Sequence, residues 1–224
     1  ITIEQKTKYP FEGEVELTFS TPGEVNFPLY LRVPEWCEDA KVQINDKALE
    51  FDAKPRSYIR INRKWKDGDQ LSFHMPMEIQ VKRWRKNHNS ASVKRGPLTF
   101  SVKIDERYER YGGTDKWPAY EIFPDSPWNY ALALNSGDQE SPFEVVKKSW
   151  PESEMVFTHE GAPIEIRAKA RRLPNWKDIG MGLPGKMQDN PTKTSQPVEE
   201  ITLIPMGAAR LRLTAFPVSG DEEE

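Results

Sequence analysis

The first hundred residues alternate between apolar and polar side chains, and this period of two constrains the fold more than any other feature. The pattern is clearest at 14–20, where Val15, Leu17 and Phe19 fall on one face of an extended segment. It recurs in segments 27–33, 41–45, 57–61 and 70–75. Alternation over this length is typical of strands with one buried and one solvated face. The sequence therefore predicts antiparallel β-sheets.

Turn residues separate these segments. Asn45-Asp46 and Asp67-Gly68 each stand between two alternating segments. Asn, Asp and Gly tolerate positive φ, so both pairs suit tight hairpins. Short strands at intervals of about 8–12 residues with such turns indicate a sandwich or a barrel. Because no amphipathic helix of ten or more residues is found, we expect an all-β chain.

The character of the sequence changes after residue 104. Residues 105–127 are charged, aromatic and interrupted by Pro and Gly, which favours a module boundary or a long connection there. At roughly 100–200 residues per domain, 224 residues allow two small domains. We therefore expect two antiparallel β-sandwich modules, jelly-roll-like, over 1–104 and 105–224.

The second module carries fewer strand patterns. Two strands are expected at 128–134 and 163–170, and a closing hairpin or corner from 200–205 and 210–214. Residues 171–199 are rich in Gly and Pro. A stretch of this length without a strand pattern predicts a long surface loop, of the kind that is usually functional or mobile.

Charge and hydropathy exclude two classes of partner. The net charge is −3, and Lys and Arg are interleaved with acids, whereas a duplex-binding surface clusters its cations. One basic segment, Lys82-Arg83-Trp84-Arg85-Lys86, could be a patch for nucleic acid or anionic polysaccharide. We favour a charged edge strand that discourages aggregation. No apolar run reaches the ~18 residues of a membrane span, so we expect no nucleic acid and no membrane partner.

The residues that usually carry catalysis or bind metal are scattered. The three histidines, His74, His88 and His159, lack the local spacing of zinc ligands. His74 occupies a polar position of a strand pattern, and we interpret it as an ordinary surface histidine. Cys37 is the single cysteine and has no base nearby in the sequence, so a small apolar residue explains it better than a nucleophile. We assign no catalytic and no metal-binding residue.

One aromatic stretch, 117–128, invites a carbohydrate interpretation. Glycosidases need two carboxylates, and Glu121 and Asp125 are a pair in an unusually aromatic setting. Trp117, Tyr120 and Trp128 could form a platform on which sugar rings stack. We favour a loop that seals a sandwich edge or an interdomain seam, because aromatic residues dominate interfaces of every kind.

Several short segments, taken together and in order, carry a further signal. They are Pro28-Leu29-Tyr30-Leu31-Arg32-Val33-Pro34-Glu35-Trp36-Cys37, Val42-Gln43-Ile44-Asn45, Tyr58-Ile59-Arg60-Ile61, Met75-Pro76-Met77, Lys94-Arg95-Gly96-Pro97-Leu98 and Glu200-Ile201-Thr202-Leu203-Ile204-Pro205-Met206-Gly207. In this order they resemble the region that follows the catalytic barrel in the β-L-arabinofuranosidase family, glycoside hydrolase family 127.

The resemblance implies that the family's catalytic residues lie outside this region. That family has an N-terminal (α/α)6 barrel followed by β-sandwich domains, and its cysteine nucleophile sits in a zinc site of the barrel with further cysteines and a glutamate. Cys37 falls at a strand end of the sandwich region and does not match that nucleophile. We therefore expect no catalytic residue here, and zinc only in the barrel.

The resulting hypothesis is a non-catalytic C-terminal accessory region of a glycoside hydrolase that acts on arabinofuranoside-containing glycans. Its partners would be the N-terminal (α/α)6 barrel and a plant-type glycan. Two alternatives stay open: a carbohydrate-binding module that uses residues 117–128, and a protein-interaction domain. The compartment is undecided, with a periplasmic or secreted bacterial location preferred over a cytoplasmic one.

Overall fold

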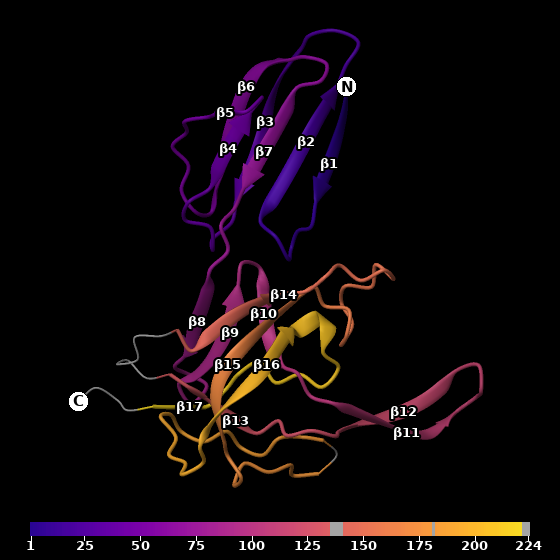
Figure 1. Ribbon diagram of the computed structural model, residues 1–224, viewed down its shortest axis with the longest axis vertical. Coiled ribbons are helices and arrows are strands. Elements are labelled where there is room, and N and C mark those ends of the chain that lie inside the picture. The colour runs from indigo at the N-terminus through magenta and orange to yellow at the C-terminus, as the bar shows by residue number, and fades with distance from the viewer. Residues whose placement is uncertain (135–140, 181, 221–224) are drawn as a thin grey trace. The chain divides into compact units, whose positions relative to one another are not determined.

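The computed structural model describes residues 1–134, 141–180 and 182–220 (Figure 1). Strands make up nearly all of its regular structure, and the one helical element described is the short 3-10 turn η1 (Met206–Ala208). The all-β prediction is confirmed. No described helix has the length and apolar character of a membrane span.

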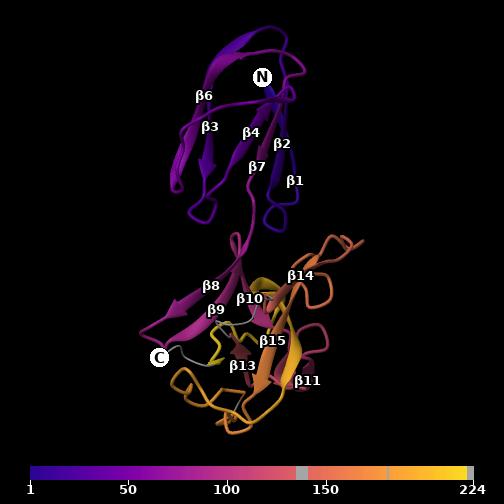
Figure 2. The ribbon, with the colours of Figure 1, turned by 60° about the vertical axis from the view of Figure 1, so that its left-hand side comes forward.

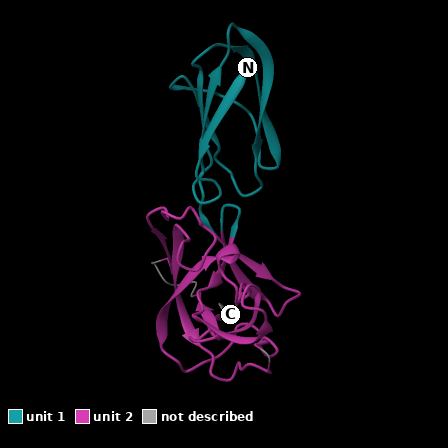
Figure 3. Cartoon of the chain, turned by 90° about the vertical axis from the view of Figure 1, so that its right-hand side faces the viewer, with its two compact units in different colours: residues 1–79, 95–98 teal, residues 80–94, 99–224 magenta. Residues whose placement is uncertain are grey.

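The chain divides into two compact units (Figure 3). The first comprises residues 1–79 and 95–98, and the second residues 80–94 and 99–224. The sequence placed this division near residue 104. The difference arises because β10 (Leu98–Val102) pairs with β16 (Val198–Pro205), which ties β10 and its hairpin partner β9 (Ser90–Arg95) to the second unit's sheet. A pairing partner so far along the chain leaves no trace in the local pattern.

The first unit is a sandwich of two antiparallel sheets (Figure 2). The larger sheet has the strand order β1-β2-β7-β4-β5, and the smaller pairs β3 with β6. The bounds are β1 Thr2–Thr7, β2 Glu14–Ser20, β3 Val25–Val33, β4 Lys41–Ile44, β5 Lys47–Ala48, β6 Ser57–Trp65 and β7 Gln70–His74. These strands cover the five alternating segments of the first hundred residues.

The alternating apolar residues of these strands form the core of the first unit. Leu17 and Phe19 of β2 face Ile59 and Ile61 of β6 within one buried cluster. Trp65 is fully buried and stacks on Phe19 with ring centroids 4.1 Å apart. The period of two in the sequence therefore corresponds to the buried faces of the two sheets.

The predicted turns also form. Asn45 and Asp46 both have positive φ, 50° and 61°, as a two-residue hairpin of the type I′ class requires. Gly68 has φ 78° in the turn between β6 and β7.

The second unit is built on one curled sheet with the strand order β17-β13-β15-β16-β10-β9-β8, while β14 pairs with β15 (Figures 1 and 2). The bounds of the strands not yet given are β8 Ile79–Trp84, β13 Tyr130–Ala133, β14 Phe143–Lys147, β15 Ile164–Arg172 and β17 Val218–Ser219. A separate two-stranded ribbon is formed by β11 (Glu106–Gly113) and β12 (Pro118–Pro124).

The basic segment 82–86 begins in the edge strand of this sheet, because β8 stands at one end of the strand order. The Lys82 Nζ lies 4.2 Å from the centre of the Trp84 ring, a cation–π contact on the exposed strand. The charged edge strand predicted from the sequence is therefore present.

The sequence predicted a closing hairpin or corner from 200–205 and 210–214, and the strand that it placed at 210–214 does not form. The first half is β16, but residues 210–214 are not a strand. The backbone N–H groups of Arg210 and Leu211 donate to the Glu106 carboxylate at 3.1 and 3.4 Å, and that of Leu213 donates to Ser101 Oγ at 2.9 Å. Side chains accept these three N–H groups, and the Leu213 carbonyl accepts the Val102 N–H of β10 at 3.2 Å.

The connection between β15 and β16 contains one isolated bridge, Asp178 with Pro184, and its described residues form no strand; residue 181 lies outside them. The segment is anchored to the unit. Trp176 is buried and its Nε1 donates to the Gly185 carbonyl at 2.9 Å. Asn190 donates to the His88 carbonyl and accepts from the Val218 N–H, both at 2.6 Å.

Candidate functional site

The aromatic residues proposed for sugar contact are distributed between two places in the second unit. Trp117 lies in the turn of the β11–β12 ribbon with 74% of its surface exposed, and Tyr120 lies on β12 at 48%. Tyr120 meets Tyr108 of β11 edge to face, with ring centroids 6.0 Å apart. Both strands therefore contribute aromatic rings to the exposed ribbon.

Trp128 lies apart from the ribbon, in a half-buried position. Its ring meets the buried Trp176 edge to face at 5.2 Å, and it packs against a cluster that includes Ala131 and Leu173. The structure thus brings Trp117 and Tyr120 onto one ribbon and gives Trp128 a packing role in the second unit.

The carboxylates within the aromatic stretch are exposed. Glu121 stands opposite Glu109 in the β11–β12 register, and the Asp125 carboxylate lies 3.8 Å from Arg107 Nε. Glycosidic cleavage by acid–base chemistry uses a carboxyl group that is held in an apolar pocket. Glu121 and Asp125 are both exposed to solvent.

Cys37 lies in the core of the first unit, fully buried. Burial raises the pKa of its thiol, which keeps the sulfur protonated and a poor nucleophile. Among the described residues no group of three or more His, Cys, Asp and Glu side chains could hold a metal ion. A cysteine-rich zinc site needs several thiolates, and the sequence has a single cysteine, Cys37.

The histidines occupy three separate surroundings. His74 is exposed and its Nδ1 lies 2.8 Å from the Glu14 carboxylate, and His88 Nδ1 lies 2.6 Å from Asp189. Only His159 joins a larger polar cluster, which was not foreseen from the sequence.

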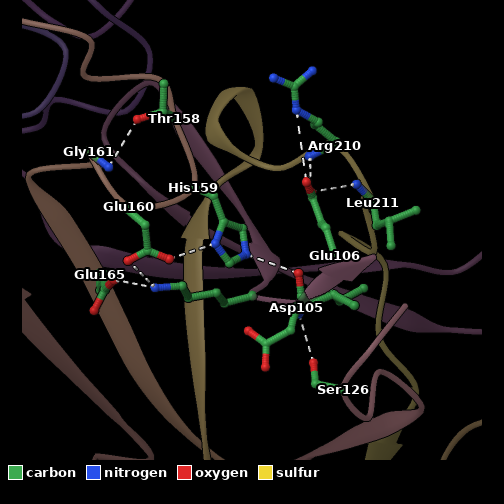
Figure 4. Close-up of polar contacts among 12 residues, drawn as sticks. Asp105, Glu106, Ser126, Thr158, His159, Glu160, Gly161, Glu165, Arg210 and Leu211 are labelled. Atoms are coloured by element: carbon green, nitrogen blue, oxygen red, sulfur yellow. Dashed lines mark hydrogen bonds and ion pairs between the residues drawn. The ribbon is translucent and has the colours of Figure 1, made fainter. Parts of the chain in front are cut away.

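Figure 4 shows the polar contacts of this cluster. The cluster borders a hollow of about 430 Å³ next to the start of β11. Its volume falls within the roughly 300–1,000 Å³ that is common for small-molecule sites. Three segments distant in the sequence form its walls: Glu106 and Tyr108 of β11, residues 157–160, and residues 207–210 with Arg212.

Glu106 fixes one wall of this hollow. Its side chain is only 8% exposed, and its carboxylate accepts the Tyr108 hydroxyl at 2.6 Å. The same carboxylate accepts the backbone N–H groups of Arg210 and Leu211 (Figure 4). Burial, followed by the contact with the Glu106 carboxylate, raises the pKa of the Tyr108 phenol. Tyr108 is therefore a protonated donor that helps hold the buried carboxylate.

His159 and Glu160 form another wall. The two ring nitrogens of His159 both face acceptors: Nε2 lies 3.0 Å from the Ile104 carbonyl and Nδ1 2.9 Å from the Glu160 carboxylate. Each ring nitrogen therefore has an acceptor within hydrogen-bond distance. The hydrogen bond from His159 is the main cause that lowers the pKa of Glu160, and Lys103, 3.4 Å from its second oxygen, adds to the effect.

The charges extend behind the hollow as a chain of alternating sign. Lys103 also lies 3.5 Å from Glu165, which in turn lies 3.1 Å from Lys148. The Glu160 and Glu165 carboxylates are therefore already compensated by lysines. Sequence reasoning missed this site because its walls come from three segments, and the only local signal was the charged and aromatic character of residues 105–127.

The chain is similar to one family model and to several solved structures. Residues 1–77 match the family model described as the GH127 middle domain of β-L-arabinofuranosidase. No curated protein matches the chain. Among solved structures, a GH127 β-L-arabinofuranosidase from Geobacillus stearothermophilus T6 matches with a TM-score of 0.62 and 23% identity, over 98% of this chain and 30% of that one.

Two further solved structures give similar values. A GH127 β-arabinofuranosidase matches with a TM-score of 0.63 and 22% identity, over 97% of this chain and 31% of that one. A structure described as a glycoside hydrolase matches with a TM-score of 0.59 and 24% identity, over 97% and 32%. At this identity the structures establish a shared fold, and the chain spans less than a third of their length. The family resemblance read from the sequence is confirmed.

Proposed function

We propose that this chain, whose residues 1–77 match the GH127 middle domain of β-L-arabinofuranosidase, is a non-catalytic accessory region of a glycoside hydrolase. The observation that carries the proposal is the match to a middle domain, together with coverage of only 30–32% of the similar structures. The enzyme as a whole would act on arabinofuranoside-containing glycans.

In this proposal the two β units brace an N-terminal (α/α)6 barrel that carries the zinc site and the nucleophile. The first unit suits that role because its two sheets share a closely packed core around Trp65 and Phe19. A packed core of this kind transmits strain instead of absorbing it, which suits a support for a catalytic domain.

The chemistry of this chain's own residues supports a non-catalytic role. The single thiol, Cys37, is buried and protonated, and the carboxylates of the aromatic stretch are solvated. The most buried carboxylate of the hollow, Glu106, accepts hydrogen bonds from the Tyr108 hydroxyl and two backbone N–H groups. None of these groups is poised to attack or protonate a glycosidic bond.

The test compares hydrolysis of an aryl β-L-arabinofuranoside by the purified chain with hydrolysis by a longer product that includes sequence preceding Ile1, both with added zinc. We expect turnover by the longer product alone. Turnover by the chain alone would overturn the non-catalytic role, and its loss in Cys37→Ser would identify the thiol as the nucleophile. An inactive longer product of correct fold would overturn the assigned substrate class.

A second candidate function, glycan contact by the ribbon, is favoured by the exposure of Trp117 and Tyr120. Titration with arabinan oligosaccharides tests it. Trp117→Ala should weaken binding without loss of stability, whereas Trp128→Ala should lower stability because it removes the ring that packs on Trp176. Binding that is absent, or unchanged in Trp117→Ala, would remove this candidate.

A further inference from the structure

We propose that the hollow between Tyr108, Phe157 and Arg210 is a binding site for an acidic saccharide, a sugar that carries a carboxylate. The inference goes beyond the proposed accessory role. It rests on the residues that line the hollow and does not depend on that role. The site is distinct from the exposed turn of the ribbon that carries Trp117.

The charges that line the hollow favour an anionic ligand. Glu106 already accepts three hydrogen bonds, and the oxygens of Glu160 face His159 and Lys103. The Arg210 guanidinium lies 3.9 Å from the Glu106 carboxylate, and its carbon lies 6.0 Å from the centre of the Tyr108 ring. Arg212 uses its Nε to hold the Ala209 carbonyl at 2.8 Å, and no carboxylate of the described residues forms an ion pair with it.

Arg210 is the side chain best placed to receive a carboxylate. Its Nε lies 3.9 Å from Glu106, its side chain is largely exposed, and its two terminal nitrogens point away from the other labelled residues (Figure 4). A guanidinium binds a carboxylate through two parallel hydrogen bonds, which fixes both position and orientation. A lysine-like point charge would not give that orientation.

Two aromatic side chains of the hollow could contact an apolar face of the ligand. Tyr108 and Phe157 both line the hollow and both keep nearly half of their surface exposed. Phe157 lies directly over Gly207, where an added Cβ would come within 2.9 Å of its ring. Aromatic faces of this kind, next to donors and acceptors, suit a sugar ring with one C–H face and a rim of hydroxyls.

The site is also held in place before any ligand arrives. The Glu106 carboxylate accepts the backbone N–H groups on both sides of the Arg210 Cα, so the base of the arginine side chain is fixed. The His159 ring is fixed from both nitrogens. Fixed donors lose less conformational entropy on binding than mobile ones. Glu160, at the exposed rim, is placed to accept a sugar hydroxyl.

The experiment is a titration of the whole chain, followed by NMR, with methyl β-D-glucuronide, its neutral counterpart methyl β-D-glucoside, and acetate. We expect saturable binding of the glucuronide, with shifts at the amides of 207–210, and much weaker binding of the other two. Arg210→Gln should weaken glucuronide binding about tenfold or more, because a hydrogen-bonded ion pair is lost, and leave the glucoside unaffected. Phe157→Ala should weaken both sugars.

The matched control is Arg83→Gln, which removes one exposed arginine from the edge strand β8. It should leave glucuronide binding unchanged. Acetate binding as tight as that of the glucuronide would overturn the saccharide part of the proposal, and glucoside binding as tight would overturn the role of the arginine. No saturable binding of the glucuronide by a folded chain, or an equal loss in Arg83→Gln, would overturn the site.

Discussion

Asp69 shows at the scale of one residue how a turn in the first unit is fixed. It is buried at the end of the β6–β7 turn, where its carboxylate accepts Asn45 Nδ2 at 2.8 Å and the Lys66 N–H at 2.9 Å and lies 3.2 Å from Arg63. Burial by itself would raise the pKa of this carboxyl, but the hydrogen bonds and the charge of Arg63 outweigh it, and the pKa is lowered.

The first prediction concerns the pH dependence that follows. Because the folded pKa is lowered, Asp69 stabilises the fold above about pH 3.9, the ordinary value for Asp, and this contribution is lost as the pH falls toward the lower folded pKa. Asp69→Asn should cost about 1–3 kcal/mol of unfolding free energy at pH 7. The deficit should shrink below about pH 3.9, as measured by urea unfolding. Asp46→Asn, an exposed turn residue, should show no such change; an Asp69→Asn deficit independent of pH would contradict the prediction.

The β11–β12 ribbon is the element that links the candidate surfaces, because it carries Trp117 in its turn and Glu106 at its start. Its turn depends on Gly113, which has φ +77°. A Cβ there would lie 2.3 Å from the Trp117 carbonyl oxygen and 2.6 Å from the Ala119 nitrogen. The neighbouring Gly112 has open space around the same position.

The second prediction uses these two glycines as a matched pair. Gly113→Ala should open the turn of the ribbon, because its Cβ meets backbone and its φ disfavours any L side chain. Amide hydrogen exchange in β11 and β12 should become faster by roughly fivefold or more, the effect of about 1 kcal/mol. Gly112→Ala should leave exchange nearly unchanged. Equal effects of the two substitutions would show that the turn geometry does not hold the ribbon.

At the scale of the whole molecule, the chain carries separate buried clusters in its two units. One cluster in the first unit contains Trp65, Phe19 and Ile61, while Ala131, Leu173 and Trp176 form a cluster in the second. Each unit therefore has apolar residues of its own to bury, the property that lets a domain unfold as a separate cooperative step.

The third prediction is that heat unfolding shows two transitions. Trp65→Ala should lower the stability of the first unit by about 3–5 kcal/mol, because it empties a large buried site, and leave the other transition in place. Ile166→Ala, buried in β15, should do the reverse. Tyr58→Ala, an exposed aromatic on the same strand as Trp65, should change stability by less than about 0.5 kcal/mol. Calorimetry measures the number of transitions and their midpoint temperatures. A single transition whose midpoint falls in both core variants would contradict independent unfolding of the two units.

Much of the first unit could be predicted because its information is local. The alternation at 14–20 and 57–61 identifies strands with one buried face, and Asn45-Asp46 identifies a turn, all within a few residues of sequence. The family resemblance was likewise carried by short segments in a fixed order. These features follow from the period of a strand and from the allowed φ of Asn, Asp and Gly.

The second unit and the hollow could not be predicted in the same way. Residues 105–127, where the sequence predicted a module boundary or a long connection, contain the two strands of a ribbon. Residues 210–214 form no strand, and the Glu106 and Ser101 side chains accept N–H groups of that segment. The sequence by itself determined the all-β class and the strands of the first unit. It also identified Cys37 as a small apolar residue. Only the tertiary structure decided where the units divide and that Glu106, His159 and Arg210 share one hollow, because pairings between distant segments arise from packing and leave no periodic signal in the chain.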